Sequence, residues 1–366
     1  MKILQLLPEL NEGGVERGTV EVNRELVRMG HESHVISKGG KLENIIAKDG
    51  GFHHQCDVCS KNILTVPGRA SGLRELLESI DPHVIHARSR VPAWLSIIAN
   101  RRLRIPFVTT VHGLNSVSPY SRVMTLGQRV ICVSEVVRDY IIKNYRTDTN
   151  KIRVIQRGVD MNYFDPSAAD GGRVGEMRES LKIGDRRVIT SVGRITWLKD
   201  YETFIKGIAA IRRSMPDVVG VIVGGYREDK QDYFRSLQKL VADEGQQEGI
   251  VFAGSQSDML SVYAMSDLIV NASLKMGNMG RTVVEALAMG RPVIATTFEG
   301  LKNLVEDGVN GRVIDNRDVR GLADAALHLL SESPASEDIR RTVPFEYTLE
   351  CMISRILDVY REVTEG

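Results

Sequence analysis

The chain has 366 residues, enough for two ordinary domains that each enclose a full hydrophobic core. Apolar residues make up 42% of it and charged residues 26%, a balance that is typical of a globular protein. The net charge of +1 does not by itself indicate a partner, and four cysteines in so long a chain exclude a disulfide framework.

Short β-branched runs alternate with helical patterns along the first half of the chain. The first helix is predicted at VERGTVEVNRELVRMG, which Gly30 ends. The strands are apolar throughout, as in a parallel sheet with helices on both faces. They are predicted at KILQLL (2–7), HVIS (34–37), HVIHA (83–87), FVTTVH (107–112), VICVS (130–134) and IRVIQ (152–156).

A polar stretch, DPSAADGG at 165–172, is the best candidate for a linker. A second series of strands follows it, separated by helical patterns such as DYETFIKGIAAIRRS. These strands are predicted at RVITSVG (187–193), VVGVIVGG (218–225), IVFAG (250–254), LIVNAS (268–273), PVIAT (292–296) and RVID (312–315).

The two series predict two doubly wound, Rossmann-like α/β domains, with a ligand cleft between the carboxyl ends of their sheets. We expect an N-terminal domain over 1–168 and a C-terminal domain over 169–345. The last segment, 346–366, is amphipathic and has no strand after it. It either closes the C-terminal domain or crosses back onto the first.

Glycine pairs and cations follow several predicted strands. Gly13 and Gly14 precede the first helix, where backbone N–H groups can bind an anion, although a simple tight turn explains them equally well. Arg194 and Lys199 flank the turn after 187–193 and suit a diphosphate, or are exposed surface cations. His112 ends a strand, at the edge of a sheet where ligands bind, or is a structural histidine.

The stretch MGNMGRTVVEALAMG, from residue 276, places glycines before a helix that contains Glu285. An acid early in a helix commonly compensates the helix dipole. Alternatively, the Glu285 carboxylate accepts hydrogen bonds from sugar hydroxyls.

Metal binding has weak support in the sequence. HHQCDVC contains His53, His54, Cys56 and Cys59, but a zinc site needs four ligands in a closed geometry, and no second CxxC or HxxxH is near. The chain also lacks an Asp-x-Asp pair, so cations and backbone amides would have to neutralise a diphosphate. We expect no metal.

Residues 82–133 contain seven arginines and no Asp or Glu, and we call them the basic segment. Solvated helices and loops account for this imbalance, as does a surface that faces phosphates on a substrate or an anionic lipid. The arginines are Arg88, Arg90, Arg101, Arg102, Arg104, Arg122 and Arg129.

Together these segments resemble retaining glycosyltransferases of the GT-B fold, family 4. The resemblance runs along nearly the whole chain, through GGVER, VIHARSRVPAW, PFVTTVHG, VICVSE and VIQRGVDMNYFDP. VGRITWLKDYETF and GRTVVEALAMGRPVIAT are its most specific segments. HARSRVPAW with TTVHG most resembles bacterial members that build cell-surface polysaccharide or lipopolysaccharide.

The resemblance implies a nucleotide-sugar site in the C-terminal domain. Arg194 and Lys199 would clamp the diphosphate, and Glu285 would hold the ribose hydroxyls. The base would lie against Ser255 and Gln256. The other donor residues that the resemblance implies are Gly13, Gly14, Gly277, Asn278, Met279, Gly280, Arg281 and Thr282.

By the same resemblance, His112 would sit by the donor sugar, and Arg88 and Arg90 would lie at the mouth of an acceptor site in the N-terminal domain. Family members are usually metal-independent, retain the anomeric configuration and let the leaving phosphate deprotonate the acceptor. No cofactor is then expected, because the protein supplies positioning and charge stabilisation.

One position departs from the family. Members usually carry two glutamates with seven residues between them, and the first of them falls on Gly277 here. Loss of that carboxylate removes a charge-assisted hydrogen bond to the donor sugar of roughly 1.5–3 kcal/mol. Either the donor sugar differs, with Asn278 or Lys275 taking over, or the donor site is weakened.

The main hypothesis is therefore a glycosyltransferase that moves a sugar from a nucleotide-diphosphate sugar to a glycan or lipid-linked acceptor. A non-catalytic GT-B protein that binds a nucleotide or glycan, or acts as a scaffold, is the alternative that Gly277 motivates. A sugar-nucleotide epimerase fits the GGVER and GRTVVEA stretches less well. No nucleic-acid partner is expected.

We expect a cytoplasmic protein, because the start MKILQLLPEL is unlike a signal peptide and no apolar run could span a membrane. A lipid-linked acceptor would bring the basic segment onto the inner face of the inner membrane. Charge reversal at Arg101, Arg102 and Arg104 would then lower binding to anionic vesicles, and unchanged binding would exclude this contact.

Overall fold

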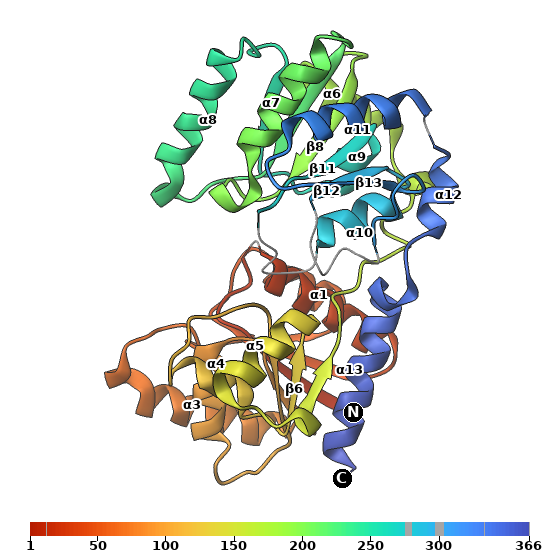
Figure 1. Cartoon of the computed structure of the whole chain (residues 1–366). Coiled ribbons are helices and arrows are strands. Elements are labelled where there is room, and N and C mark those ends of the chain that lie inside the picture. Colours follow the sequence, from red (N-terminus) through yellow and green to blue (C-terminus); the bar gives the residue numbers. More distant parts are fainter. Residues whose placement is uncertain (12, 275–279, 297–303, 333, 366) are drawn as a thin grey trace. The chain divides into compact units, whose positions relative to one another are not determined.

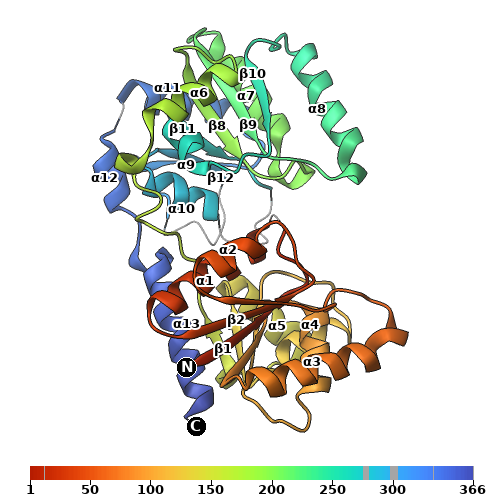
Figure 2. The same ribbon diagram turned by 180° about the vertical axis from the view of Figure 1, so that it is seen from behind.

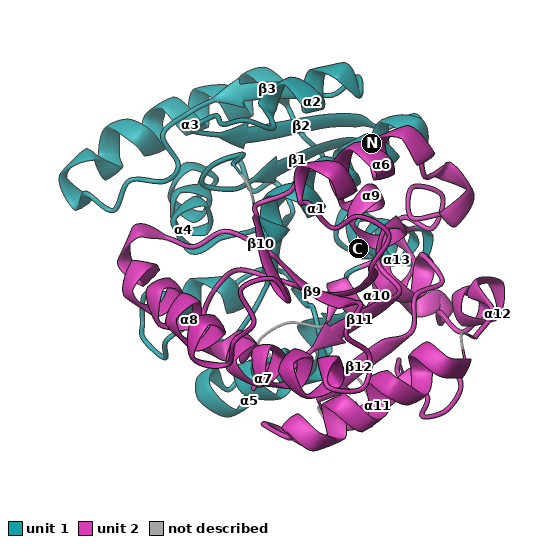
Figure 3. Cartoon of the chain, turned by 90° about the horizontal axis from the view of Figure 1, so that it is seen from above, with its two compact units in different colours: residues 1–157, 350–366 teal, residues 158–349 magenta. Residues whose placement is uncertain are grey.

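The computed structural model describes residues 1–11, 13–274, 280–296, 304–332 and 334–365. The chain forms two compact units (Figure 3), and each is described by itself. The first unit contains residues 1–157 and 350–366, and the second contains residues 158–349. Among the described residues, no helix has both the length and the apolar character needed to cross a membrane.

A seven-stranded parallel sheet, in the order β3-β2-β1-β4-β5-β6-β7, forms the centre of the first unit. Its strands are β1 (Lys2–Leu6), β2 (Glu32–Ser37), β3 (Phe52–Gln55), β4 (Val84–Ala87), β5 (Phe107–Val111), β6 (Arg129–Cys132) and β7 (Ile152–Val154). Its helices, most of them labelled in Figures 1 and 2, are α1 (Gly14–Arg28), α2 (Glu43–Lys48), α3 (Val66–Ile80), α4 (Arg90–Ala99), α5 (Glu135–Tyr145) and α13 (Leu349–Thr364).

The second unit has a six-stranded parallel sheet in the order β10-β9-β8-β11-β12-β13. Its strands are β8 (Arg187–Val192), β9 (Val218–Val223), β10 (Ile250–Gly254), β11 (Leu268–Asn271), β12 (Val293–Thr296) and β13 (Gly311–Ile314). Its helices are α6 (Gly171–Ser180), α7 (Tyr201–Arg212), α8 (Gln231–Asp243), α9 (Met259–Ala264), α10 (Arg281–Ala288), α11 (Val319–Glu332) and α12 (Ser336–Arg341).

Apolar strands arise because both faces of each sheet are covered. In β8, Val188 belongs to one buried cluster and Ile189 to another on the opposite face. In β1, Leu4 and Leu6 pack into a buried cluster with α3 and α4 residues. The prediction of two doubly wound, Rossmann-like α/β domains is confirmed.

The boundary between the units lies before the polar stretch 165–172, at Arg157 and Gly158. The backbone of Val159 bonds to Tyr347 and Leu349, and Arg340 donates to the carbonyl of Met161 at 2.6 Å. These contacts tie the residues after Gly158 to the second unit, so the stretch at 165–172 is internal to that unit and is not a linker.

The C-terminal helix α13 packs in the first unit. The Tyr360 hydroxyl is 2.7 Å from Nδ1 of the buried His86, and Glu362 pairs with Arg129 and Arg153 at 2.7 and 2.6 Å. The chain thus returns to its first unit at residue 350, after completing the second.

Candidate active site

Both sheets have a point where the strand order reverses, between β1 and β4 and between β8 and β11. Ligands of doubly wound sheets bind outside the carboxyl ends of the strands at this point. Gly13 and Gly14 follow β1, and Arg88 follows β4 directly. In the second unit, Arg194 and Lys199 follow β8. These five residues therefore lie at the sheet edges where doubly wound folds bind ligands.

Lys199 lies against the end of β8. A Cβ added to Gly193 would stand 2.6 Å from Cε of Lys199, so the lysine side chain lies close against the backbone at this glycine. Burial, and next the neighbouring Arg194, lowers the pKa of Lys199. Arg194 itself is exposed. Arg194 is thus an exposed surface cation, whereas Lys199 packs against the backbone of Gly193.

The loops after β8 and β11 are joined to each other. The 3-10 turn η5 (Trp197–Lys199) accepts a hydrogen bond at the Leu198 carbonyl from the Leu274 amide, 2.8 Å away. Asp200 then begins α7, and its buried carboxylate accepts a bond from the Thr203 hydroxyl at 2.7 Å. These contacts fix the backbone that carries Lys199.

Glu285 lies in the second turn of α10 and is 7% exposed. Its Oε2 accepts a hydrogen bond from the Tyr263 hydroxyl at 2.7 Å, and its Oε1 pairs with Nε of Arg281 at 2.7 Å. Compensation of the helix dipole is therefore the wrong explanation, because that effect is confined to the first turn. An ionised carboxylate can accept hydrogen bonds at about four lone-pair sites in all.

The other donor-site predictions fall on three segments. Gly280 caps α10, and Thr282 in its first turn lies 3.5 Å from the Asn271 amide at the end of β11. Ser255 and Gln256 follow β10, and a Cβ added to Gly225 would stand 2.5 Å from the Ser255 hydroxyl. Gly277, Asn278 and Met279 lie outside the described residues, as does Lys275.

Two guanidinium groups meet at the beginning of α1. Arg157 donates to the carbonyl of Gly14, and a Cβ added to Gly18 would stand 3.0 Å from Nη2 of Arg157 and 3.4 Å from Nη2 of Arg88. Arg88 is buried, and its Nη1 donates to Oε1 of Gln5 at 2.9 Å. Sequence reasoning missed Arg157, although its place just after a predicted strand, like that of Arg194, could have indicated it.

His112 lies in a cavity of the first unit of about 310 Å³, which Arg88 and Arg90 also line. We call it the polar cavity. Burial, and next the charges of Arg88 and Arg157, holds the pKa of His112 well below its ordinary value. The imidazole is therefore neutral at pH 7.

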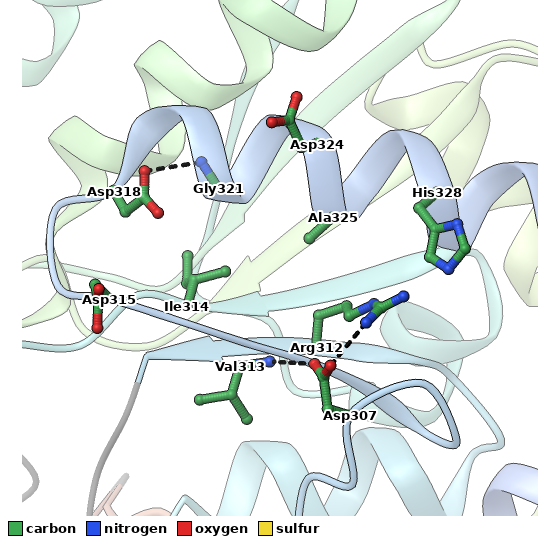
Figure 4. A pocket seen from close by; sticks show the side chains of 10 residues that line it. All are labelled: Asp307, Arg312, Val313, Ile314, Asp315, Asp318, Gly321, Asp324, Ala325 and His328. Carbon is green, nitrogen blue, oxygen red and sulfur yellow. Dashed lines mark hydrogen bonds and ion pairs between the residues drawn. The ribbon is translucent and has the colours of Figure 1, made fainter.

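Figure 4 shows a pocket of about 460 Å³ in the second unit, at β13 and α11. Asp315, Asp318 and Asp324 line it, and its Arg312 is paired with Asp307 at 2.7 Å. Four aspartates and one arginine are among the residues that line it, and such an excess of carboxylates repels a diphosphate, so this pocket does not suit the donor.

The residues of HHQCDVC make ordinary local contacts. Nε2 of His54 is 2.9 Å from Nδ1 of His34, and Nε2 of His53 is 2.9 Å from the Ser37 hydroxyl. Within the described ranges, no group of three or more His, Cys, Asp or Glu could hold a metal ion.

The arginines of the basic segment differ in their surroundings. Arg101, Arg102 and Arg104 are exposed in the turn after α4, whereas Arg129 is paired with Glu362 of α13. The segment is thus only partly a solvent-facing cationic surface.

Comparisons with known proteins find relatives of both halves of the chain. The D-inositol 3-phosphate glycosyltransferase of Mycolicibacterium smegmatis is 27% identical, in an alignment that covers 69% of this chain and 61% of that protein. This chain therefore spans about three fifths of the length of that relative. A GDP-mannose-dependent alpha-(1-6)-phosphatidylinositol monomannoside mannosyltransferase of the same organism is 28% identical, over 74% of this chain and 73% of that protein.

Among solved structures, a glycosyltransferase from Rickettsia africae is 28% identical and has a TM-score of 0.87 over 100% of this chain and 99% of that one. The Glycosyltransferase Family 4 model matches residues 12–163, and the Glycosyl transferases group 1 model matches residues 174–343. The chain thus matches a Glycosyltransferase Family 4 model in its first half and a Glycosyl transferases group 1 model in its second, and its two doubly wound sheets are those of the GT-B glycosyltransferase fold.

Proposed function

We propose that the chain transfers a sugar from a nucleotide-diphosphate sugar to a glycan or lipid-linked acceptor, with retention of configuration, in the synthesis of a bacterial cell-surface polysaccharide or lipopolysaccharide. The observation that carries this proposal is the placement of Lys199 across Gly193, beside Arg194, at the strand-order reversal of the second sheet. Two cations held at this point suit a diphosphate whose negative charge grows as it leaves.

In the proposed reaction, the bond between the anomeric carbon of the sugar and the diphosphate oxygen breaks. A bond from the same carbon to the acceptor oxygen forms on the same face, and the acceptor proton passes to the leaving phosphate. Arg194 and Lys199 neutralise the leaving group, so the proposal requires neither a metal ion nor another cofactor. Glu285, held by Tyr263 and Arg281, accepts hydrogen bonds from the ribose hydroxyls.

The first unit is proposed to bind the acceptor in the polar cavity. Arg88 and Arg90 supply positive charge there, and the neutral His112 is proposed to bond to a hydroxyl of the donor sugar. The mycobacterial relatives support an acceptor with a phosphate, because their names contain inositol 3-phosphate and phosphatidylinositol monomannoside. A lipid-linked acceptor would also place Arg101, Arg102 and Arg104 at the inner face of the inner membrane.

Calorimetry with UDP and GDP tests the donor site. We expect one of the two nucleotides to bind, and Lys199→Met to weaken it roughly 10- to 100-fold, because a charge-assisted hydrogen bond contributes about 1.5–3 kcal/mol. Lys206→Met is the matched control, since it removes the same charge from an exposed position of α7. Absence of binding by both nucleotides, or equal effects of the two substitutions, would contradict the proposed donor site.

A non-catalytic GT-B protein remains the second candidate, and two observations favour it. Gly277 stands where the family carries a glutamate. In addition, both oxygens of Glu285 already accept bonds within the second unit. Such a protein would bind the nucleotide without consuming any nucleotide-sugar, which separates the two candidates.

A further inference from the structure

A second cavity of the first unit, of about 470 Å³, is lined mainly by apolar side chains, and we call it the apolar cavity. Ile63 of the 3-10 turn η1 (Ile63–Thr65) and Val66 of α3 contribute to it, together with Val91, Trp94 and Ile98 of α4. Its volume lies in the range of sites that hold small molecules, roughly 300–1,000 Å³. None of the described residues that line it is acidic.

The rim of the apolar cavity exposes large aliphatic side chains. Ile63 is 81% exposed and the adjacent Leu64 is 90% exposed, while Ile98 on α4 is 39% exposed. A single exposed aliphatic residue is ordinary, but an exposed cluster beside an apolar cavity marks a binding surface. The hydrocarbon part of a ligand would cover these side chains. Their apolar surface would then be removed from water, which is favourable.

The walls of this cavity are held by specific bonds. Arg69 donates from Nε to the Thr65 hydroxyl and from Nη2 to the Asn62 carbonyl, both at 3.0 Å, which fixes the turn that carries Ile63. On the other side, Nε1 of Trp94 donates to the carbonyl of Tyr120 at 3.0 Å. These hydrogen bonds hold both walls of the apolar cavity in place.

The apolar cavity adjoins the polar cavity at Arg90. Arg90 lines the polar cavity, and its guanidinium carbon lies 5.3 Å from the ring centroid of Tyr120, which lines the apolar cavity. The side chain of Arg90 also donates to the Ser121 hydroxyl at 3.2 Å. A cationic compartment and a hydrocarbon compartment thus meet at the beginning of α4.

We propose that the apolar cavity binds one hydrocarbon chain of the acceptor, while the anionic head of the same molecule lies in the polar cavity near Arg88 and Arg90. This proposal rests on the proposed function and narrows the acceptor to a lipid whose phosphate is linked to its chain. Charge complementarity supports it, because α4 and its flanking loops carry arginines and no acid in the basic segment. The occupant is the acceptor itself and not the bulk membrane, because the cavity has a limited volume.

Binding of alkyl phosphates to the full chain tests this proposal. Trp94 and Trp197 are the two tryptophans, so a Trp197→Phe background leaves Trp94, in the cavity wall, as the fluorescent probe. We expect hexyl, octyl and decyl phosphate, each below its micelle concentration, to bind about fourfold more tightly per added methylene. The gain should stop once the chain fills the cavity.

Ile98→Asp places a charge in the cavity and should weaken decyl phosphate binding at least about tenfold. Val136→Asp is the matched control, because Val136 of α5 is 37% exposed, close to the value for Ile98, and does not line the cavity. We expect Val136→Asp to bind decyl phosphate as tightly as the parent does. Equal urea midpoints for the two variants exclude unfolding as the cause of a difference.

Two results would overturn the proposal. One is no binding of any alkyl phosphate, and the other is binding that Ile98→Asp and Val136→Asp affect equally, as expected of a non-specific lipid surface. Calorimetry with UDP and GDP on the same sample separates the claims. If a nucleotide binds while the alkyl phosphates do not, only the chain-binding proposal is wrong; if neither binds, the proposed function fails as well.

Discussion

At the scale of single residues, burial controls the charge of two histidines in the first unit. His86 is fully buried, with Nδ1 2.7 Å from the Tyr360 hydroxyl and Nε2 2.6 Å from the Thr110 hydroxyl. Burial first, and then the charge of Arg88, holds the pKa of His86 well below its ordinary value. His112 in the polar cavity is kept neutral in the same way.

The neutral state of His86 predicts a loss of stability in mild acid. Below about pH 6.5 the unfolded chain binds a proton at this histidine and the folded chain does not, so stability falls as the pH falls. The slope from one such histidine reaches about 1.4 kcal/mol per pH unit and disappears above about pH 7.5. Urea unfolding at several pH values between about pH 7.5 and about pH 5 measures this slope.

His86→Asn should remove its share of this slope, because asparagine does not titrate. A stability that does not vary between about pH 7.5 and pH 5, or equal slopes in His86→Asn and the parent, would contradict a neutral buried His86.

Residue positions next to strands could be predicted from the sequence, but their partners could not. Arg194 and Arg88 come directly after strand patterns and Lys199 lies in the next turn, so their place at a sheet edge is a local property of the sequence. The bond from Tyr263 to Glu285 depends on the packing of α9 against α10, and that of Arg157 to Gly14 joins residues far apart in the chain. Neither pairing has a sequence signal.

At the scale of elements, α13 is fixed in the first unit by its last turns. Glu362 accepts from Nε of Arg129 at 2.7 Å and from Nη2 of Arg153 at 2.6 Å. The hydrogen bond from Arg153 is the main cause that lowers the pKa of Glu362. Because Arg129 is on β6 and Arg153 on β7, one carboxylate links the helix to two neighbouring strands.

Glu362→Gln should therefore destabilise the first unit by about 1 kcal/mol at low salt, and by less in high salt, because the group is partly exposed. Glu350→Gln, which removes the same charge from an exposed position of α13, serves as the control and should change stability less. Urea unfolding at two salt concentrations measures both. An equal loss in the two variants would mean that Glu362 does not anchor the helix.

The hydrophobic pattern of the sequence alone predicted most of the strands and helices. Each strand predicted from a β-branched run is present, because helices on both faces require such runs. β3 lacks a β-branched run: its sequence is FHHQ, and it lies at the edge of the sheet, where burial is low. The pattern of α13 predicted an apolar face, but not which unit that face covers, because amphipathicity carries no information about the partner.

At the scale of the whole molecule, each unit supplies one part of the proposed reaction. The second unit presents Arg194, Lys199 and Glu285 at the β8 and β11 edge. The first presents Arg88, Arg90 and His112 in the polar cavity. Gly277, where the sequence departs from the family, lies outside the described residues, so its effect on donor choice or activity stays a prediction.

Turnover of nucleotide-sugars by the full chain tests the central claim most directly. A panel of UDP- and GDP-sugars is incubated with the protein and a bacterial lipid extract, with and without EDTA, and is followed by mass spectrometry. The proposed function predicts that one donor is consumed to its nucleoside diphosphate and a glycosylated acceptor, equally with EDTA, and that Lys199→Met slows this roughly 10- to 100-fold. Nucleotide binding without consumption of any donor would contradict catalysis and leave the non-catalytic GT-B protein as the explanation.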